Sequence, residues 1–459
     1  MRMAVWGSGY YYKKFKKYIR MEDVAYIIDN DEKKVGSFID EKEIKSPQFL
    51  NTENLECILI LVKNYEEIIK QLSELGISKR MILTYENLSL LTNKIPCVTI
   101  GNYVQYLSEW VECVEENIIF ICTHCIARSG VPIVLMNMAN LLLQMGYKVL
   151  LGTLEDGSLE EEIKKYRIPY IKDIEIFFYD KYFTDFIKNT CEFVFLGTIA
   201  LADYGRKIAA MGCKIKWWLH ESESIYYKNY PLPKDDNIIF YGAGERVISE
   251  FKKYYTMQIR HLLYYLPEKE QEFYLSVEEK ITFICIGEIC KRKAQDILIS
   301  ALQIMNKSLR HRIKVIFAGS KGDLYIDWKN ICKVVPEIIY ENELNQIQIE
   351  ELYKKADYLI CPSRDDPMPL VVTQAFQHGI PCIISDEVGQ SQYIKSGGNN
   401  QIFRNEDKEQ LKQILEYLAI SGKRTEPCYY SRKIYEDYFS EKVMRKTLRK
   451  IIDESNDEK

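Results

Sequence analysis

Short apolar runs alternate with amphipathic stretches along almost the whole chain. The apolar runs are rich in Ile, Val and Phe and end in Gly, Ser, His or Asp, a pattern typical of buried parallel strands. Between them apolar residues recur at helical spacing, as in residues 133–145, which end just before Gly146. Strands that alternate with helices in this way predict a doubly wound α/β fold.

This alternation starts afresh at several points, which divides the chain into segments. We expect two doubly wound domains of similar size that face a cleft, and such domains bind ligands beyond the carboxyl ends of their strands. The predicted segments are a small Rossmann-like α/β domain at 1–95, a linker at 96–116, domains at 117–265 and 266–428, and a helical tail at 429–459 that packs back on the first of these two domains.

The first segment has the outline of a nucleotide-binding βαβ unit. An apolar run leads into Gly7 and Gly9, and a second apolar run ends at Asp29, where a ribose-binding acid would lie. Tyr12 occupies the third glycine position of the fingerprint, so the motif is incomplete. Two interpretations therefore stay open: a ligand site at Gly7, Gly9 and Asp29, or a tight turn without a ligand.

Composition excludes several classes of protein. The 459 residues are 47% hydrophobic and 28% charged, with a net charge of −4, which gives no overall attraction to nucleic acid. No apolar run approaches the roughly 20 residues that a membrane span needs, and we expect a cytoplasmic protein. The 13 cysteines include no CxxC pair and mostly lie in apolar runs, so we predict neither a metal site nor a cofactor.

Polar side chains follow the strand predicted at 358–361. Asp365 and Asp366 come after this strand, and the next helix begins near Pro369 or Leu370, with Gln374 about one turn further on. Carboxylates accept hydroxyl hydrogen bonds, while an amide both donates and accepts them. The segment therefore predicts a site for a polyhydroxylated ligand such as a sugar or ribose.

A basic cluster follows the strand that ends at Gly287. Lys291, Arg292 and Lys293 precede a helix, where cations are unfavourable beside the helix dipole unless an anion joins them. A solvated charge run is the alternative, but the position at a strand end favours a diphosphate site.

Two further strand ends carry candidate residues in segment 117–265. Gly130 would let the backbone approach a phosphate or sugar closely. His124 and His220 both lie at strand ends, and His220, with Glu221 beside it, is the better catalytic candidate. A structural role is the alternative for each histidine.

Five motifs follow one another between residues 117 and 425: SGVPIVLMNMANLLLQMGYKVLL, WWLHESE, GEICKRKAQDILISAL, VIFAGS and ADYLICPSRDDPMPLVVTQAFQHGIPCIISDEVG. In this order they resemble glycosyltransferase family 4, whose members have the GT-B fold. The resemblance implies a retaining transferase that moves a sugar from a nucleotide donor held mainly by the C-terminal domain, usually without a metal ion.

Each matching position carries an implied role. Gly130 falls on the glycine loop near the donor phosphates, and His220 on the histidine that faces the donor sugar. Lys293 falls on the cation that clamps the diphosphate, with Arg292 as a second candidate. The implied catalytic residues are His220, Asp366 and Lys293, and the implied donor-binding residues are Gly130, Glu288, Arg292, Lys293, Asp366, Pro369, Leu370 and Gln374.

Two positions depart from the family pattern. The paired acids of the family, eight positions apart, fall on Asp366 and Gln374, so the ribose contact loses its charge. Glu288 stands where an arginine is common. A charge-assisted hydrogen bond contributes roughly 1.5 to 3 kcal/mol against about 1 for a neutral one, so donor binding could weaken by one or two orders of magnitude.

Two functions from different classes follow. The first is an active transferase in cell-surface polysaccharide synthesis, acting on a glycan or lipid-linked acceptor. The alternative is a weak or inert transferase-like protein that binds glycan or stabilises a partner enzyme. A lipid-linked acceptor would bring the chain to the inner face of the cell membrane as a peripheral protein, and one conceivable contact surface comprises Arg206, Lys207, Lys214, Lys216, Trp217 and Trp218.

Overall fold

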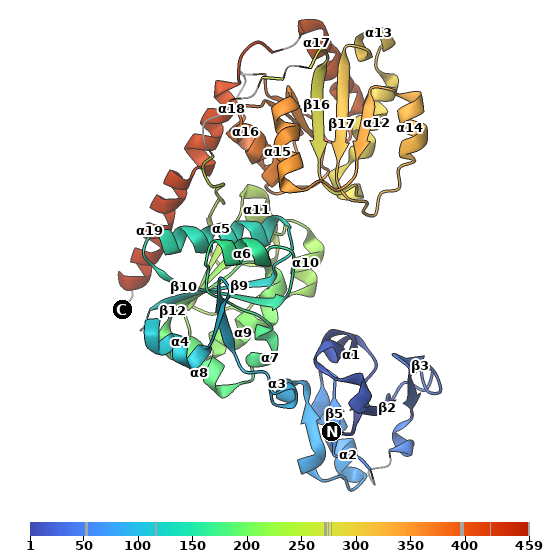
Figure 1. Ribbon diagram of the computed structural model, residues 1–459, viewed down its shortest axis with the longest axis vertical. Coiled ribbons are helices and arrows are strands. Elements are labelled where there is room, and N and C mark those ends of the chain that lie inside the picture. The colour runs from blue at the N-terminus through green and yellow to red at the C-terminus, as the bar shows by residue number, and fades with distance from the viewer. Residues whose placement is uncertain are drawn as a thin grey trace. The chain divides into compact units, whose positions relative to one another are not determined.

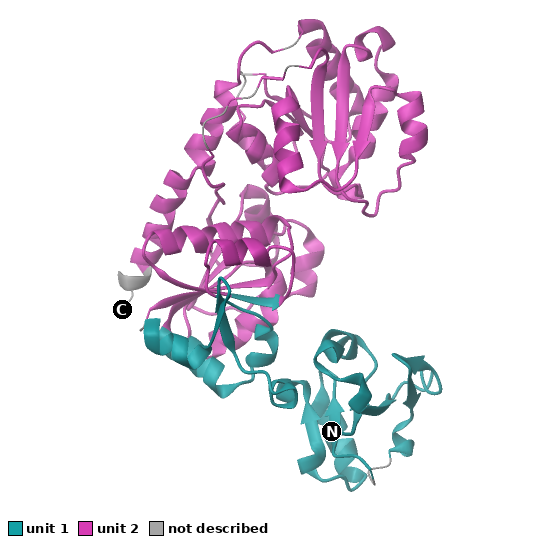
Figure 2. Cartoon of the chain, viewed as in Figure 1, with its two compact units in different colours: residues 1–116, 152–154, 170–190 teal, residues 117–151, 155–169, 191–459 magenta. Residues whose placement is uncertain are grey.

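The apolar runs form three β-sheets in the computed structural model of the chain (Figure 1). The chain divides into two units, one of residues 1–116, 152–154 and 170–190, and the other of 117–151, 155–169 and 191–459 (Figure 2). The structure describes residues 1–457 apart from 51–53, 115–116, 270–272, 274, 277, 395–398 and 423.

The elements from β1 to α3 form the N-terminal module. Its sheet, the first of the three, has the order β3-β4-β2-β1-β5-β6. All of its pairs are parallel except the short β3/β4 pair. Its core contains Trp6, Ile28, Ile58 and Leu72. The elements are β1 (Met3–Trp6), α1 (Tyr10–Phe15), β2 (Val24–Ile28), β3 (Phe38–Ile39), β4 (Lys42–Lys45), β5 (Cys57–Ile60), α2 (Tyr65–Glu74), β6 (Ile82–Thr84) and α3 (Leu88–Thr92).

The second sheet has nine strands in the order β15-β14-β13-β12-β9-β10-β11-β7-β8. Its strands are β7 (Cys97–Ile100), β8 (Tyr103–Tyr106), β9 (Ile118–Cys125), β10 (Lys148–Glu155), β11 (Tyr170–Ile171), β12 (Cys191–Leu196), β13 (Ile215–Leu219), β14 (Ile238–Gly242) and β15 (Ile259–His261). Its helices are α4 (Leu107–Val114), α5 (Gly130–Gln144), α6 (Glu160–Lys165), α7 (Ile174–Phe177), α8 (Lys181–Thr190), α9 (Ala202–Ala210), α10 (Ser224–Asn229) and α11 (Glu245–Tyr254).

Two regions of this sheet differ from the sequence expectations. Where a linker is predicted over 96–116, an antiparallel hairpin and α4 form instead, and residues 115–116 lie outside the described part. Only Val98 of the two hairpin strands is buried, so they lack the continuous buried apolar run that marks the other strands in the sequence. The conceivable contact surface around Trp217 and Trp218 does not form, because both indoles and Lys216 are at most 1% exposed in a core strand.

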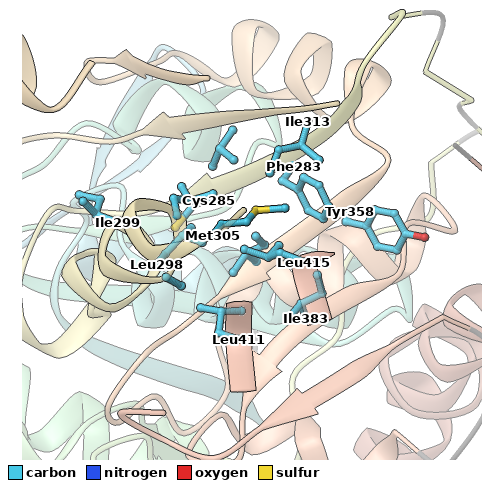
Figure 3. Packing of buried hydrophobic residues seen from close by; sticks show 14 of the residues in the cluster. Phe283, Cys285, Leu298, Ile299, Met305, Ile313, Tyr358, Ile383, Leu411 and Leu415 are labelled. Carbon is cyan, nitrogen blue, oxygen red and sulfur yellow. The ribbon is translucent and has the colours of Figure 1, made fainter. Parts of the chain in front are cut away.

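The third sheet is parallel throughout, with the order β18-β17-β16-β19-β20-β21. Phe283, Leu298 and Tyr358 pack in its core with the helix residues Leu411 and Leu415 (Figure 3). The elements are β16 (Ile281–Ile286), α12 (Gln295–Ile304), α13 (Lys307–Arg310), β17 (Ile313–Ala318), α14 (Trp328–Val334), β18 (Ile338–Glu341), α15 (Gln346–Lys355), β19 (Tyr358–Cys361), α16 (Leu370–Gln377), β20 (Cys382–Ser385), β21 (Gln401–Phe403) and α17 (Lys408–Ser421).

The C-terminal segment is helical, with α18 (Tyr429–Ile434), a π-helical turn over Tyr435–Phe439, and α19 (Glu441–Asp457). Arg445 of α19 donates a 3.0 Å hydrogen bond to the side chain of Gln144 at the end of α5. Met444 and Leu448 form part of the buried face of α19. The tail therefore contacts the domain that begins at residue 117. No helix in the described part of the chain is both long and apolar enough to cross a membrane.

Candidate functional site

The loop between β19 and α16 brings Asp366 into a buried position. Strand β19 ends at Cys361, and α16 begins at Leu370 with Pro369 as its N-cap, where the sequence predicts the helix start. Asp366 is only 6% exposed. Its backbone N–H donates to the Glu387 carbonyl at 3.3 Å, and its own carbonyl accepts from the Gly389 N–H at 3.0 Å. The loop after β20 therefore fixes the backbone on both sides of this carboxylate.

The basic cluster after β16 faces this carboxylate. Residues Lys291–Lys293 form a single 3-10 turn, and the Lys293 ammonium donates to Asp366 Oδ2. The Arg292 guanidinium lies 3.4 Å from the same oxygen. Burial acts to lower the pKa of Lys293, but the charge of Asp366, the hydrogen bond to it and the nearby Cys361 together raise the pKa above its usual value. Lys293 is therefore charged at neutral pH, as a diphosphate clamp requires.

Arg364 joins the two loops and was not among the sequence candidates. Its guanidinium donates to both carboxylate oxygens of Asp296, at 3.0 and 2.7 Å, and its backbone N–H donates to the Arg292 carbonyl at 2.8 Å. A bidentate pair of this kind fixes orientation as well as distance. Arg364 thus holds the basic turn beside the acidic loop.

Gln374 lies half-buried about one turn into α16. Its Oε1 accepts a hydrogen bond from the Tyr353 hydroxyl at 3.1 Å, which orients the amide and leaves the NH₂ group as a donor. The Pro369 carbonyl, one residue before Leu370, accepts from Tyr264 at 3.2 Å and from Gln390 at 2.8 Å. The start of α16 is therefore held by three side chains from other elements.

His220 directly follows β13, and its imidazole packs against Trp218 with the ring centroids 4.4 Å apart. In the described part of the chain the buried Nε2 atom has no hydrogen-bond partner. Glu221 accepts hydrogen bonds from Thr198 and from the backbone N–H groups of Ile199 and His220, so it fixes the loop that carries the imidazole. Within the described residues no hydrogen bond or ion pair joins His220 to Asp366.

We expect His220 to make the protein sensitive to acid. Burial lowers the pKa of its imidazole from 6.5 to about 3, so the unfolded chain binds a proton that the folded chain rejects. This penalty is absent above pH 6.5 and grows as the pH falls towards 3, so His220 should remove about 2 kcal/mol of stability between pH 7.5 and 5. Urea unfolding at both pH values should show a smaller loss in His220→Gln than in the wild type. If both proteins lose the same stability between pH 7.5 and 5, the pKa of His220 is not lowered by burial.

Two other predicted donor residues make fewer contacts. Gly130 opens α5, and open space surrounds the position where its Cβ would be. Glu288 is exposed, and its carboxyl group lies against Gly322, where an added Cβ would be 2.9 Å from it. The structure thus brings Asp366, Lys293 and Arg292 together and leaves Gly130 and Glu288 outside that cluster.

In the N-terminal module Asp29 is already engaged by its own turn. Its carboxylate accepts from the backbone and hydroxyl of Ser8, from the Asp31 N–H at 3.0 Å and from Lys34 at 3.3 Å. A Cβ on Gly7 would lie 2.8 Å from the Leu61 carbonyl, so close backbone packing accounts for that glycine, whereas Gly9 has open space beside it. A ligand role for Gly7, Gly9 and Asp29 stays a prediction.

Among the described residues no group of three or more His, Cys, Asp or Glu side chains could hold a metal ion.

The chain is similar to proteins described as glycosyltransferases. The chain is 22% identical over 352 residues to an uncharacterized glycosyltransferase of Haemophilus influenzae, covering 69% of this chain and 95% of the relative. It is 28% identical over 142 residues to an uncharacterized glycosyltransferase of Methanocaldococcus jannaschii, covering 28% of this chain but only 36% of that relative. The crystal structure of Anabaena HepE in complex with UDP-glucose superposes with a TM-score of 0.60 at 12% identity, covering 73% of this chain and 99% of HepE.

Three family models match consecutive parts of the chain. Residues 1–83 match "C2185-like, N-terminal", residues 116–285 match "Glycosyl-transferase family 4", and residues 267–433 match "Glycosyl transferases group 1". The similar solved structures confirm the GT-B fold expected from the sequence. Residues 116–433 of this chain therefore belong to the glycosyltransferases of family 4 and group 1, and an additional α/β module precedes them.

Proposed function

We propose that this glycosyltransferase moves a sugar from a nucleotide-sugar donor to a glycan or lipid-linked acceptor in cell-surface polysaccharide synthesis, with retention of configuration. The observation that carries the proposal is the contact of the half-buried Lys293 ammonium with Asp366, beside Arg292. A donor supplies what this cluster lacks, namely a diphosphate for the two cations and sugar hydroxyls for the carboxylate.

The cluster suggests an exchange of partners on donor binding. The diphosphate takes over Lys293 and Arg292, and the released Asp366 carboxylate accepts hydrogen bonds from the sugar. The anomeric C–O bond then breaks, the acceptor oxygen bonds to the same carbon on the same face, and the acceptor proton passes to the departing phosphate oxygen. Two fixed cations stabilise the negative charge that develops on this leaving group, and we expect them to do so without a metal ion.

A panel of nucleotide sugars tests this proposal, with the purified full chain assayed for donor binding and for donor hydrolysis. UDP-glucose is the first donor to test, because HepE was crystallised with it. We expect one donor to bind and turn over, equally well with and without EDTA. If no donor binds at millimolar concentration, the second candidate gains support, namely an inert protein that binds glycan or a partner enzyme. The exposed Glu288 and the neutral Gln374 are the observations that favour it.

We expect Gln374→Glu to tighten donor binding about tenfold, because a charged acceptor forms stronger hydrogen bonds with ribose hydroxyls than an amide does. The Tyr353 hydroxyl, 3.1 Å from Oε1, can donate equally well to a carboxylate, so the side chain should keep its orientation. Titration of donor into both proteins measures the effect. Gln303→Glu adds the same charge at an exposed position of α12 and serves as the control. A weaker affinity in Gln374→Glu would place the ribose elsewhere.

A further inference from the structure

Two side chains from the domain of the nine-stranded sheet converge on Asp365, the residue before Asp366. The Ser222 hydroxyl donates to the Asp365 carboxylate at 3.0 and 3.1 Å. Arg246, the second residue of α11, donates to Asp365 Oδ1 from Nε at 3.2 Å and from a terminal nitrogen at 2.9 Å. Ser222 lies two residues after His220, so the loop that carries the imidazole also reaches the loop that carries Asp366.

The Arg246 guanidinium has a second acidic partner. It pairs with Glu387 in the loop after β20, whose backbone carbonyl accepts the 3.3 Å hydrogen bond from Asp366 N–H. One planar guanidinium thus spans the loops after β19 and β20, and Asp366 lies where they meet. The planar donor fork suits such a junction, because it fixes the relative orientation of two carboxylates rather than their charge alone.

Arg246 also reduces the negative charge around the site where a diphosphate would bind. Asp366 has Lys293 and Arg292 beside it, whereas the two negative charges of Asp365 and Glu387 share the single positive charge of Arg246. A diphosphate brings additional negative charge to this end of the sheet. Without Arg246 the carboxylates of Asp365 and Glu387 would have lost their cation. Their negative charges would then repel the diphosphate, because nearby like charges disfavour each other.

We infer that Arg246 is a positioning residue that holds the Asp366 loop in the donor-binding arrangement through Asp365 and Glu387. This inference rests on the proposed function as far as the donor is concerned, but the coupling between the loops is independent of any activity. Arg246 does not itself contact the reacting atoms. It raises the population of the arrangement that a donor can bind, and the apparent donor affinity scales with that population.

Hydrogen exchange in the full chain without ligand tests the coupling directly. The reporters are the amides of Asp366 and Gly389, which form the two hydrogen bonds between the loops. We expect Arg246→Gln and Asp365→Asn each to speed their exchange about tenfold, with Arg246→Lys in between because lysine keeps the charge but lacks the fork. The double variant Arg246→Gln/Asp365→Asn should exchange less rapidly than two independent effects predict. Arg260→Gln, which breaks a pair with Glu454 in the same unit, should leave both amides unchanged.

Donor kinetics give the second measurement. Arg246→Gln should raise the KM for the donor about tenfold and leave kcat within about twofold, because saturating donor restores the arrangement. Unchanged exchange in Arg246→Gln, or strictly additive effects in the double variant, would overturn the inference. If the exchange results hold but no donor is turned over by any variant, the proposed function fails and the coupling stands. A fall in kcat at unchanged KM in Arg246→Gln would also overturn the inference that Arg246 is a positioning residue, since Arg246 would then act in the chemical step.

Discussion

Lys293→Ala should abolish donor turnover, with a fall in kcat/KM of at least about a thousandfold. The Lys293 ammonium is the cation that directly contacts Asp366, and its side chain is only 17% exposed. Removing a charged group that stabilises the departing diphosphate removes an interaction that is strongest in the transition state, which accounts for a loss of this size. Single-turnover assays with the donor identified in the panel measure it.

The same substitution affects the fold, so a matched control is needed. Without Lys293 the buried Asp366 keeps Arg292, at 3.4 Å, as its one cationic partner among the described residues, and we expect about 1 to 3 kcal/mol lower stability. Lys291→Ala removes an exposed cation two positions away in the same turn and should leave turnover within about twofold. If Lys293→Ala is folded at the assay temperature and still turns over donor at a tenth of the wild-type rate, Lys293 does not clamp the diphosphate.

The sequence predicts those parts of the site that follow from local order along the chain. Asp366 and Lys293 each lie just beyond the end of a buried parallel strand, and neighbouring strands bring such loops to one edge of a sheet. The sequence therefore predicts that both lie at strand ends, and it predicts the start of α16, but it does not predict that Lys293 and Asp366 contact each other. The doubly wound fold follows from the same alternation of apolar runs.

Contacts between distant charged residues left no such signal. Arg364 and Asp296 are 68 residues apart, and Arg246 and Asp365 are 119 apart, so nothing in the spacing singles out either pair among 128 charged side chains, 62 basic and 66 acidic. The hairpin of β7 and β8 was missed for another reason: its two strands pair locally, but only Val98 in them is buried, so they lack the apolar run of a buried strand. Long-range contacts, rather than local propensity, determine the two charged pairs.

Gly389→Ala should disrupt the donor loop although the substitution changes no charge. A Cβ on Gly389 would lie 1.6 Å from the Pro367 carbonyl oxygen, so the backbone on one side must move. The Gly389 N–H also donates to the Asp366 carbonyl at 3.0 Å, and the movement would break that bond. We expect about 3 kcal/mol lower stability in urea unfolding, from the clash and the lost hydrogen bond together.

Donor binding should weaken further than stability alone explains, by about a hundredfold, because a shift of about 1 Å in Asp366 misplaces the contact with the sugar. Gly422→Ala separates this clash from ordinary glycine strain. Gly422 has φ +86° but open space around its Cβ position, so its substitution should reduce stability by about 1 kcal/mol and leave donor affinity unchanged. If the two variants lose stability and affinity equally, then the close approach of Gly389 to Pro367 does not hold Asp366 in place, and the loop after β20 has no part in donor binding.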